Sequence, residues 1–346
     1  MFLLFLYYLS FLIFFLNCPP SALARVMPSQ TTDPSTKTTP KSYSNKLENL
    51  ESFLHAQKYL HHFGYLVPRN ENLTDIFDTR FELAVARFQS NFGLPITGKL
   101  DSATLRQISA PRCGVPDTSF TLHGTRRYVY FPGKPRWTRQ MPMKLTYAFS
   151  PDYMIRYVKI SEIKSAFKRA FSRWASVIPV SFAEIEDYIY ADIKIGFYSG
   201  DHGDSEPFDG VLGVLAHSFS PESGRFHLDA AEKWTVDLEK EKSTVAIDLE
   251  SVATHEIGHL LGLAHSSVQE SIMYPSLNPR EKKVDLQLDD IQGVQSLYGS
   301  NPNFSISSLS ESDLSTNQAV NFRARSSIWV FFMLVLSSLP IFFLLN

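Results

Sequence analysis

Apolar side chains recur along much of the chain, and their spacing changes near residue 129. Between residues 46 and 110 they recur at intervals of three and four, which places them on one face of an α-helix. Polar starts and Gly93 divide this pattern into three stretches, which cover residues 47–66, 78–94 and 100–109. The spacing therefore predicts a small bundle of three helices over 46–110.

Beyond residue 129, short stretches with apolar residues at alternate positions predict strands, and longer stretches of helical spacing stand between them. The strands are expected at 144–150, 180–185, 191–197 and 210–219, and the helices at 161–178, 248–262 and 285–299. Strands mixed with helices in this order predict an α/β (α+β) domain over 129–300, in which one mixed sheet packs against a few helices.

The N-terminal end is strongly apolar. Residues 1–17 are almost wholly apolar, and Ala22 and Ala24 give the small-x-small pattern of a signal-peptide cleavage site. We therefore predict a signal peptide over 1–24 and a secreted chain. An uncleaved membrane anchor is the alternative, which the shortness of the apolar run disfavours.

The C-terminal end is apolar over residues 328–345 and has no Lys or Arg after this stretch. Small residues at and after Ser315 and a polar spacer precede it, as in the signal for a glycolipid (GPI) anchor, whose tail is removed. We predict a polar linker over 301–315, an anchor signal over 316–346 and attachment at Ser315 to the outer leaflet of the plasma membrane. A tail-anchored transmembrane helix is the alternative.

Composition narrows the class of protein. The chain has 33 Lys and Arg against 35 Asp and Glu, a net charge of −2, which gives no indication of a nucleic-acid partner. Sequons at Asn72 and Asn303 fit an extracellular glycoprotein. Of the two cysteines, Cys18 would leave with the signal peptide, so Cys113 would remain alone. This excludes a fold held by disulfides and leaves Cys113 an intermolecular disulfide, a free buried thiol or a metal bond.

The segment HEIGHLLGLAH carries the clearest chemistry. On a helix, His255 and His259 lie on one face at the spacing with which two imidazoles hold zinc. Gly262 lets the chain turn, so that His265 can supply a third nitrogen. Three protein ligands leave a fourth position open, as in catalytic zinc sites. Glu256 is not a ligand; we expect it to take a proton from water that the metal activates for attack on a peptide carbonyl.

A second group of candidate ligands lies upstream, between residues 201 and 234. Four nitrogen or oxygen ligands can close a tetrahedral structural zinc site, and they are His202, Asp204, His217 and His227. Three carboxylates near glycine-rich turns offer the oxygen ligands that calcium prefers, and they are Asp209, Asp229 and Glu232. A solvated polar loop is the alternative, but six of the ten histidines fall in the two groups.

These motifs resemble those of the matrix metalloproteinases, specifically the short plant type that lacks a hemopexin-like domain, over residues 46–300. HEIGHLLGLAH followed by SIMYPS is similar to the metzincin zinc helix and its Met-turn, which implies that Met273 forms a hydrophobic base beneath the zinc. Ser266 after the third histidine matches the matrix group. The resemblance implies a metzincin catalytic domain with a mixed sheet and a long zinc-binding helix, preceded by a three-helix propeptide domain.

HGDSEPFDG and RFHLDAAEKW resemble the structural zinc and calcium loops of the family. By this likeness the three carboxylates above bind calcium together with main-chain carbonyl groups, those of Gly210, Leu212 and Val214. The loop between His217 and His227 is shorter than in many vertebrate members. This weakens the case for a further calcium site that would use Asp192.

PRCGVPD, residues 111–117, resembles the cysteine switch of the family. The resemblance implies that the Cys113 thiolate closes the fourth position of the catalytic zinc in a latent zymogen, and zinc itself promotes loss of the thiol proton. It also implies that Arg112 and Asp117 pair to support the switch. The helical domain then corresponds to a propeptide over 25–128.

The resemblance also indicates where a substrate binds. It makes GVLGVLAHSF the sheet edge beside the zinc, to which an extended peptide can add as a further strand. Leu215 and Ala216 would supply backbone contacts, and Tyr274 and Pro275 would wall a pocket for an apolar residue after the scissile bond. Simple core packing is the alternative for these residues.

Taken together, these patterns predict a zinc metalloendopeptidase that cleaves extracellular proteins, contains Zn²⁺ and Ca²⁺, and is GPI-anchored on the extracellular face of the plasma membrane. If released, it would enter the cell wall or extracellular space. We expect a monomer, and an activating protease could cut at Arg126-Arg127, although such a pair is more often surface charge. The alternatives are a catalytically silent surface protein that binds a partner and a zinc hydrolase of non-peptide amides.

Overall fold

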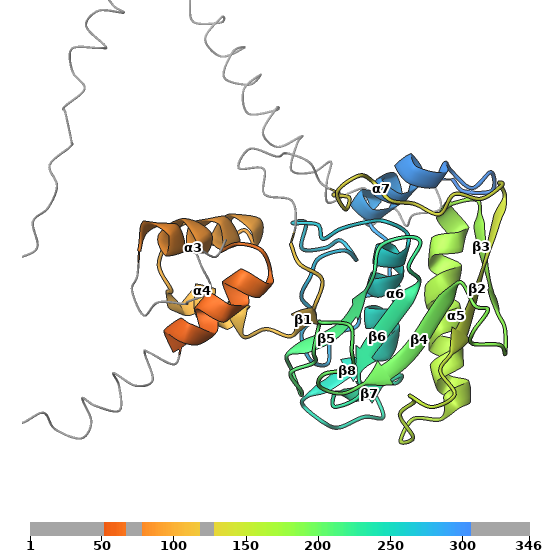
Figure 1. Cartoon of the computed structure of the whole chain (residues 1–346), viewed down its shortest axis with the longest axis horizontal. Helices are drawn as coiled ribbons and strands as arrows, with labels where there is room; N and C mark the ends of the chain where they lie inside the picture. The colour runs from red at the N-terminus through yellow and green to blue at the C-terminus, as the bar shows by residue number, and fades with distance from the viewer. Residues whose placement is uncertain (1–51, 67–77, 118–127, 306–346) are drawn as a thin grey trace, which may run out of the picture. The chain divides into compact units, whose positions relative to one another are not determined.

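The structure, a computed structural model, describes residues 52–66, 78–117 and 128–305 (Figure 1). Several predictions lie outside these residues and stay predictions: the signal peptide, the sequon at Asn72, the basic pair Arg126-Arg127, the attachment residue Ser315 and the anchor signal. None of the described helices is long and apolar enough to cross a membrane.

Three helices form the N-terminal domain, as predicted. They are a helix over 52–62, α3 (Thr79–Asn91) and α4 (Ser102–Ile108). Asp78 and Asp101 cap α3 and α4, because each side chain accepts a hydrogen bond from the main-chain N–H three residues further on. The apolar faces of the helices enclose a core rich in aromatic side chains, among them Tyr65, Phe81, Phe88 and Phe92.

The second domain is built on a six-stranded mixed sheet with the strand order β1-β5-β6-β4-β2-β3 (Figure 1). Its strands are β1 (Arg112–Cys113), β2 (Met143–Phe149), β3 (Val180–Glu184), β4 (Ile193–Tyr198), β5 (Val214–Ser218) and β6 (Arg225–Asp229). Neighbouring strands are parallel except β5 and β6, which are antiparallel. A separate small sheet pairs β7 (Lys233–Thr235) with β8 (Ala246–Asp248).

Two helices, α5 (Ile160–Val177) and α6 (Leu249–Leu260), lie side by side against the sheet (Figure 1). Helix α5 is amphipathic and turns Phe167, Phe171 and Trp174 into the core. Every residue of α6 is buried, so its polar side chains must find partners inside the protein. This buried helix is the one predicted to carry the zinc ligands. The last helix is α7 (Leu288–Tyr298).

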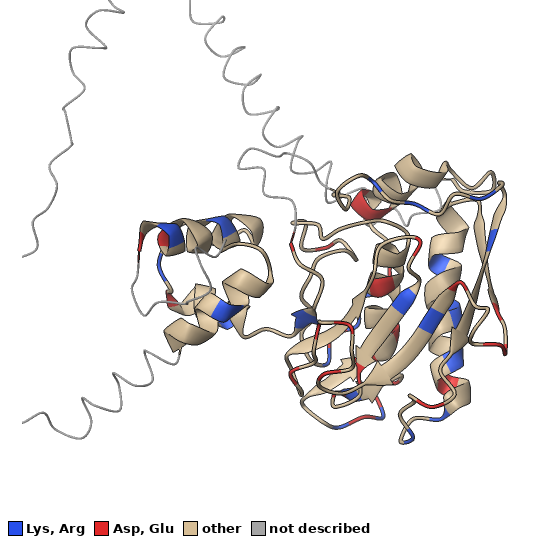
Figure 2. Ribbon diagram, in the orientation of Figure 1, with Lys and Arg blue, Asp and Glu red and all other residues tan. Residues whose placement is uncertain are grey.

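Charged residues of both signs are interspersed along the described chain, in keeping with the net charge of −2 (Figure 2). One buried charge joins the two central helices. Glu250 of α6 is paired with Arg169 and Arg173 of α5, at 2.6 Å in each case. Because both guanidinium groups come from α5, these pairs fix the position of α6 relative to its neighbour.

The predicted strands are in the right places, but the prediction was incomplete. The strand expected over 210–219 is shorter, because Gly210 and Leu212 have φ values of 95° and 65° and form a turn before β5. Strand β1 was not predicted, and a two-residue strand leaves no alternation to detect. Strand β6 was missed because its histidine and aspartate were interpreted as loop ligands. The small sheet of β7 and β8 was also missed.

Candidate active site

Helix α6 positions two of the predicted zinc ligands. Asp248 caps its N-terminus by accepting hydrogen bonds from the main-chain N–H and the hydroxyl of Ser251, at 2.9 and 2.7 Å. His255 and His259 lie one turn apart on the same face, and their Nε2 atoms are 3.1 Å apart. The two imidazoles therefore point to one place.

Gly262 turns the chain so that His265 joins them. Its φ is +103°, and a Cβ atom there would lie 2.2 Å from the carbonyl oxygen of Pro135, so a larger residue is excluded for two reasons. Nε2 of His265 lies 3.2 Å from Nε2 of His259. Zinc–nitrogen bonds of about 2.0 Å in a tetrahedron place two nitrogen ligands roughly 3.3 Å apart. The three imidazoles thus fit zinc.

The Nδ1 atoms of His255 and His259 also have hydrogen-bond partners, which fix the orientation of the two rings. Nδ1 of His255 lies 2.7 Å from the carbonyl oxygen of Ile272, and Nδ1 of His259 lies 2.8 Å from that of Leu263. Because a carbonyl oxygen can only accept, each Nδ1 carries the proton and each Nε2 presents its lone pair. Burial lowers the pKa of both imidazoles well below the usual value, which favours the neutral form that binds metal.

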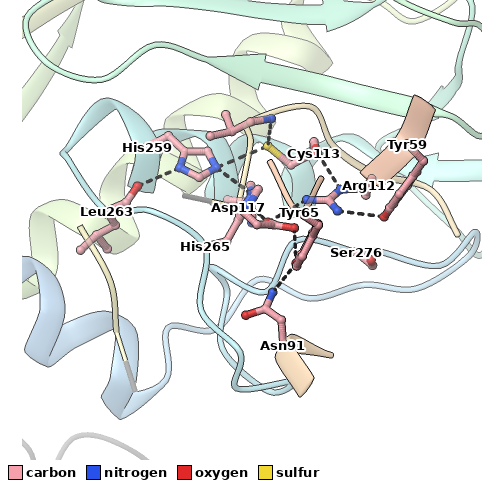
Figure 3. Close-up of polar contacts among 12 residues, drawn as sticks. Tyr59, Tyr65, Asn91, Arg112, Cys113, Asp117, His259, Leu263, His265 and Ser276 are labelled. Atoms are coloured by element: carbon pink, nitrogen blue, oxygen red, sulfur yellow. Dashed lines mark hydrogen bonds and ion pairs between the residues drawn. The ribbon is translucent and has the colours of Figure 1, made fainter. Parts of the chain in front are cut away.

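Cys113 supplies the fourth ligand atom of this group. Its Sγ lies 3.3 Å from Nε2 of His259 (Figure 3). The ligand atoms of Cys113 and the three histidines all lie within 4.8 Å of one another. Burial raises the pKa of the thiol well above its usual value, and the carboxylate of Glu256 adds to this effect. A thiolate at this place therefore depends on a cation such as zinc.

Main-chain hydrogen bonds on both sides hold the segment around Cys113. Strand β1 pairs with β5 in parallel, and the N–H groups of Arg112 and Gly114 donate to carbonyl oxygens next to or within β5 at 3.0 and 2.8 Å. On the other side, the N–H of Cys113 donates to the carbonyl oxygen of Pro275 at 2.9 Å. The edge of β5 that was predicted to pair with a substrate is thus occupied by residues 111–114.

Arg112 and Asp117 form the predicted ion pair, with 2.9 Å between Nη2 and Oδ1, and both side chains are almost fully buried (Figure 3). Nη1 of Arg112 donates to the hydroxyl of Tyr59 at 2.8 Å, and the hydroxyl of Tyr65 donates to Oδ2 of Asp117 at 2.7 Å. Burial by itself would raise the pKa of Asp117, but Arg112 and His265 outweigh it and hold the pKa below its usual value. The helical domain thus contributes two tyrosines that support a charged pair.

Asp117 makes a further contact that the sequence did not predict. Its Oδ1 lies 2.6 Å from Nδ1 of His265, a residue 148 positions away. The first two zinc histidines bind backbone carbonyls of their own domain, whereas the third binds a carboxylate of the switch. No local pattern reveals such a long-range pair. The switch therefore touches the metal centre at Cys113 and, through His265, at Asp117.

The second group of candidate ligands also comes together. His202 and Asp204 lie in the loop after β4, and His217 of β5 is the register partner of His227 of β6. Oδ2 of Asp204 lies 2.8 to 2.9 Å from a ring nitrogen of each histidine, and the four ligand atoms lie within 4.8 Å of one another. Burial would raise the pKa of Asp204, but its hydrogen bonds lower it, so it is a carboxylate. The set fits a closed structural zinc site.

Comparison with known proteins agrees with these two centres. Residues 136–299 match the family model described as "Matrixin", and residues 50–108 match the one described as "Putative peptidoglycan binding domain". The chain is 60% identical to Metalloendoproteinase 4-MMP of Arabidopsis thaliana, over 78% of this chain and 79% of that protein. The chain belongs to the matrixin family.

Two further relatives, one from a plant and one from human, are also similar to this matrixin. It is 53% identical to Metalloendoproteinase 1-MMP of Arabidopsis thaliana, over 83% of this chain and 80% of that protein. It is 36% identical to human Matrilysin, over 72% of this chain and 86% of that protein. The predicted likeness to plant matrix metalloproteinases is confirmed. The protein is a zinc metalloendopeptidase with a propeptide-like helical domain, a catalytic zinc site and a second, structural site.

Glu256 of this matrixin lies next to the first zinc histidine on α6 and is only 1% exposed. Burial raises its pKa to about 7. Among the described residues, no hydrogen-bond partner reaches its Oε2 atom. It lines the same cavity as Cys113 and His255. Glu256 is thus buried in the wall of this cavity, and one of its two oxygen atoms has no hydrogen-bond partner among the described residues.

Met273, which the resemblance implies as a base beneath the zinc, packs against the zinc helix. A Cβ atom at Gly258 of α6 would lie 2.2 Å from its sulfur, so glycine makes room for the methionine. Asp290 of α7 holds the turn, because its carboxylate accepts from the N–H of Ile272 at 2.9 Å and from that of Met273 at 3.1 Å. The Met-turn is therefore fixed by a buried carboxylate.

Asp290 and its neighbour Asp289 are site residues that were not predicted from the sequence. The hydroxyl of Ser266, the residue after the third zinc histidine, donates to Oδ2 of Asp289 at 2.7 Å. Two adjacent aspartates in the first turn of a predicted helix are the signal that could have found them. That signal is ambiguous, because acidic residues are common in the first turn of exposed helices as well.

The three carboxylates predicted to bind calcium lie close enough to influence one another. Burial, followed by the charges of Asp229 and Asp209, raises the pKa of Glu232 to about 7, and burial also raises that of Asp229. Each carboxylate accepts a main-chain hydrogen bond of 2.6 to 3.1 Å from the loop, and the donors are Gly210, Leu212 and Val214. Oε2 of Glu232 is buried, and no described residue is its hydrogen-bond partner.

Asp192 has other partners. Its Oδ1 accepts from Arg139 at 2.7 Å, and its Oδ2 accepts from the main-chain N–H and the hydroxyl of Thr146 at 2.7 and 2.8 Å. These bonds already involve both oxygens of the carboxylate. Arg139 supplies a positive charge at this place, in keeping with the weak case for a further calcium ion there.

A cavity opens beside the catalytic centre. Its wall contains Leu215, Tyr274 and Pro275, three of the residues predicted to contact a substrate. The fourth, Ala216, contributes through its carbonyl oxygen, which accepts the 2.8 Å hydrogen bond from Gly114. Because Cys113 and Glu256 also line the cavity, it adjoins the position at which peptide hydrolysis would take place.

Proposed function

We propose that this matrixin is a cell-surface endopeptidase that is made latent and acts on extracellular proteins. The observation that carries the proposal is the shared site of Cys113, the three zinc histidines and Glu256. Their ligand atoms converge, Glu256 lines the adjoining cavity, and the switch segment occupies the neighbouring sheet edge. A thiol in this position would block the catalytic zinc, and such a block is useful only if the metal centre has an activity to inhibit.

The residues of the open site have separate tasks in the proposed mechanism. His255, His259 and His265 hold zinc, which supplies a Lewis acid that activates water and polarises a carbonyl group. Glu256 accepts the proton of the attacking water and then donates it to the nitrogen of the departing amine. Oε2 of Glu256 is suited to this, since it is buried, lines the cavity and has no protein partner among the described residues.

The substrate would take the place of the switch segment. Carbonyl oxygens next to and within β5 accept hydrogen bonds from Arg112 and Gly114, and an extended peptide can use the same acceptors when residues 111–114 leave. The side chain after the scissile bond would then enter the cavity walled by Leu215 and Tyr274. Pairing with a sheet edge favours a peptide over other amides, which supports an endopeptidase.

We further propose a calcium ion at Asp209, Asp229 and Glu232. Burial, and to a smaller extent the neighbouring carboxylates, raises the pKa values of Asp229 and Glu232, and a divalent cation would stabilise the charged carboxylates at this place. The nearby carbonyl groups of Gly210, Leu212 and Val214 would complete the oxygen ligands. Calcium would thereby stiffen the loop that leads into β5.

Location at the cell surface is supported by the two apolar ends and the sequons. A signal peptide over 1–24 and an anchor signal over 316–346 would place the protein on the outer leaflet of the plasma membrane. Asn303 is exposed, as a glycosylated residue must be. Partition of the cellular protein into detergent, and its release by a phospholipase that cuts glycolipid anchors, would test the anchor; retention after the phospholipase would favour a transmembrane tail.

The enzymatic proposal is tested with the full chain, after zinc content has been measured. Cleavage of a quenched peptide with Leu after the scissile bond is followed before and after a mercurial blocks Cys113. We expect activity only after treatment, and its loss with a zinc chelator. Activity from the start would refute latency, and no cleavage of any peptide in a wide panel by folded, zinc-loaded, treated protein would refute the protease.

A further inference from the structure

One cationic residue, Lys283, belongs to the wall of the cavity beside the catalytic centre. Half of the residues that line it are apolar or aromatic, and they are Leu215, Val252, Ile272, Tyr274, Pro275 and Leu277. Lys283 is the single Lys or Arg among the described residues that line this cavity. A single cationic residue in a partly apolar pocket is the type of polar group that sets specificity for a ligand.

Lys283 is held in place by the zinc helix. Its main-chain N–H donates to the hydroxyl of Ser251 at 2.8 Å. Ser251 also lines the cavity, belongs to α6 and precedes the first zinc ligand, His255, by one helical turn. The charge of Lys283 is close enough to help lower the pKa of His255. The position of Lys283 is therefore tied to the catalytic helix.

The ammonium group of Lys283 can donate a hydrogen bond to another partner. Its Nζ donates to the carbonyl oxygen of Gln269 at 2.5 Å and lies 5.3 Å from the centroid of the Tyr274 ring. An ammonium group has three N–H donors. Within the described structure, the carbonyl of Gln269 is the one hydrogen-bond acceptor recorded for Nζ. Burial lowers the pKa of Lys283, in agreement with partial loss of water around the charge.

We propose that Lys283 determines the specificity of this pocket. It favours, directly after the scissile bond, a side chain with an apolar stem and an acceptor or anionic tip, such as Glu or Gln, over an apolar chain of similar length, such as Met. A polar group built into a pocket discriminates against a ligand that leaves it without a partner. This inference rests on the proposed function, because it needs a substrate side chain in the cavity.

The test compares peptides that differ only in the residue after the scissile bond, with Met, Gln, Glu or Lys there. The full chain, loaded with zinc and treated with a mercurial, is assayed for kcat/KM on each peptide. We expect Glu and Gln to exceed Met in the unaltered protein. Lys283→Met should lower the ratio of Glu to Met by about tenfold, which corresponds to about 1.4 kcal/mol, and Lys283→Glu should shift the preference to Lys.

Lys282→Met is the matched control. The ammonium of Lys282 lies 3.4 Å from Glu250 and 3.6 Å from Asp248, and Lys282 does not line the cavity, so the ratio should stay as in the unaltered protein. Because each ratio is internal to one preparation, a variant of lower stability still gives an answer. If Lys283→Met cleaves the peptides with the same ratio of Glu to Met as the unaltered protein, the role of Lys283 is overturned. The proposed protease activity is not affected by that result. If the unaltered protein, loaded with zinc and treated with the mercurial, cleaves none of the peptides, both the role of Lys283 and the proposed protease activity are overturned.

Discussion

The two zinc centres of this matrixin each combine four ligands, but they differ in where the last ligand comes from. At the structural centre all four ligands belong to one short stretch, residues 202–227, and Oδ2 of Asp204 touches all three imidazoles at 2.8 to 2.9 Å. At the catalytic centre three histidines lie within residues 255–265, and the fourth ligand, Cys113, is 146 positions away from His259 in sequence.

This difference separates a permanent site from one that can be opened. Loss of a ligand from the structural centre requires the loop after β4 or a strand of the central sheet to come apart. Loss of Cys113 requires that a two-residue edge strand leave β5 and the neighbouring carbonyl group of Pro275. The switch is nevertheless held firmly, because Asp117 is paired with Arg112 and bound to His265 in the protein interior. The same metal thus serves stability at one centre and regulated chemistry at the other.

The largest effect should come from Glu256→Ala. We expect kcat/KM of the mercurial-treated protein to fall by roughly 10²–10⁴-fold, since a general base of this kind contributes about that much. The zinc content should stay at two ions per chain, because Glu256 is not a ligand. The exposed Glu239→Ala serves as the control. Loss of one zinc ion in Glu256→Ala would mean that the carboxylate holds the metal.

A change at the structural centre should act on stability. His217→Ala removes one ligand of a closed site, and we expect the free energy of unfolding to fall by more than about 4 kcal/mol, as on loss of a structural metal. Thermal unfolding and zinc analysis of the purified protein measure this. If His217→Ala unfolded at the temperature of the unaltered protein, the distinction between the two centres would have to be abandoned.

A change in the switch should act on latency. Asp117→Asn leaves Arg112 without its buried countercharge, and breaking such a pair costs about 3–5 kcal/mol. The untreated variant should therefore show part of the activity that the mercurial releases, whereas untreated Cys113→Ser should show most of it. The peptide assay without mercurial compares them. Full latency of Asp117→Asn would show that Cys113 alone keeps the site closed.

The smallest effect concerns the rate of zinc loss. After a mercurial has displaced Cys113, a chelator should remove the catalytic zinc faster than the structural zinc, because one centre then has three protein ligands and the other has four. In the latent protein the two rates should be closer. Release is followed with a coloured zinc indicator. A single rate for both ions after treatment would contradict the comparison.

Much of the catalytic centre could be predicted because its information is local. His255, His259 and His265 lie within one helix and one turn, so their spacing alone brings them together. The helices of the N-terminal domain follow from the apolar spacing in the same way. The structural centre was found from its ligand types, although its geometry depends on the pairing of β5 with β6, of which β6 was not predicted.

The rest depends on contacts between distant parts of the chain. The bond from Asp117 to His265 and the support of the Met-turn by Asp290 join residues 148 and 17 to 19 positions apart, and no periodicity records them. Lys283 is similar, because its place in the cavity wall follows from a bond to Ser251 of α6, which comes 32 residues earlier. Such contacts form only when the folded chain brings distant residues together, so the spacing of residues in a single sequence does not reveal them.

Strand β1 has a consequence for how activation depends on concentration. While residues 111–117 belong to the same chain as the active site, they act as an inhibitor at an effective concentration on the order of millimolar. One cut between Asp117 and Met143 breaks none of the contacts that hold Cys113, but it turns a first-order closing step into a second-order one. Dilution would then release the propeptide, whereas a confined space would let it rebind, so the surroundings would set the lifetime of the active enzyme.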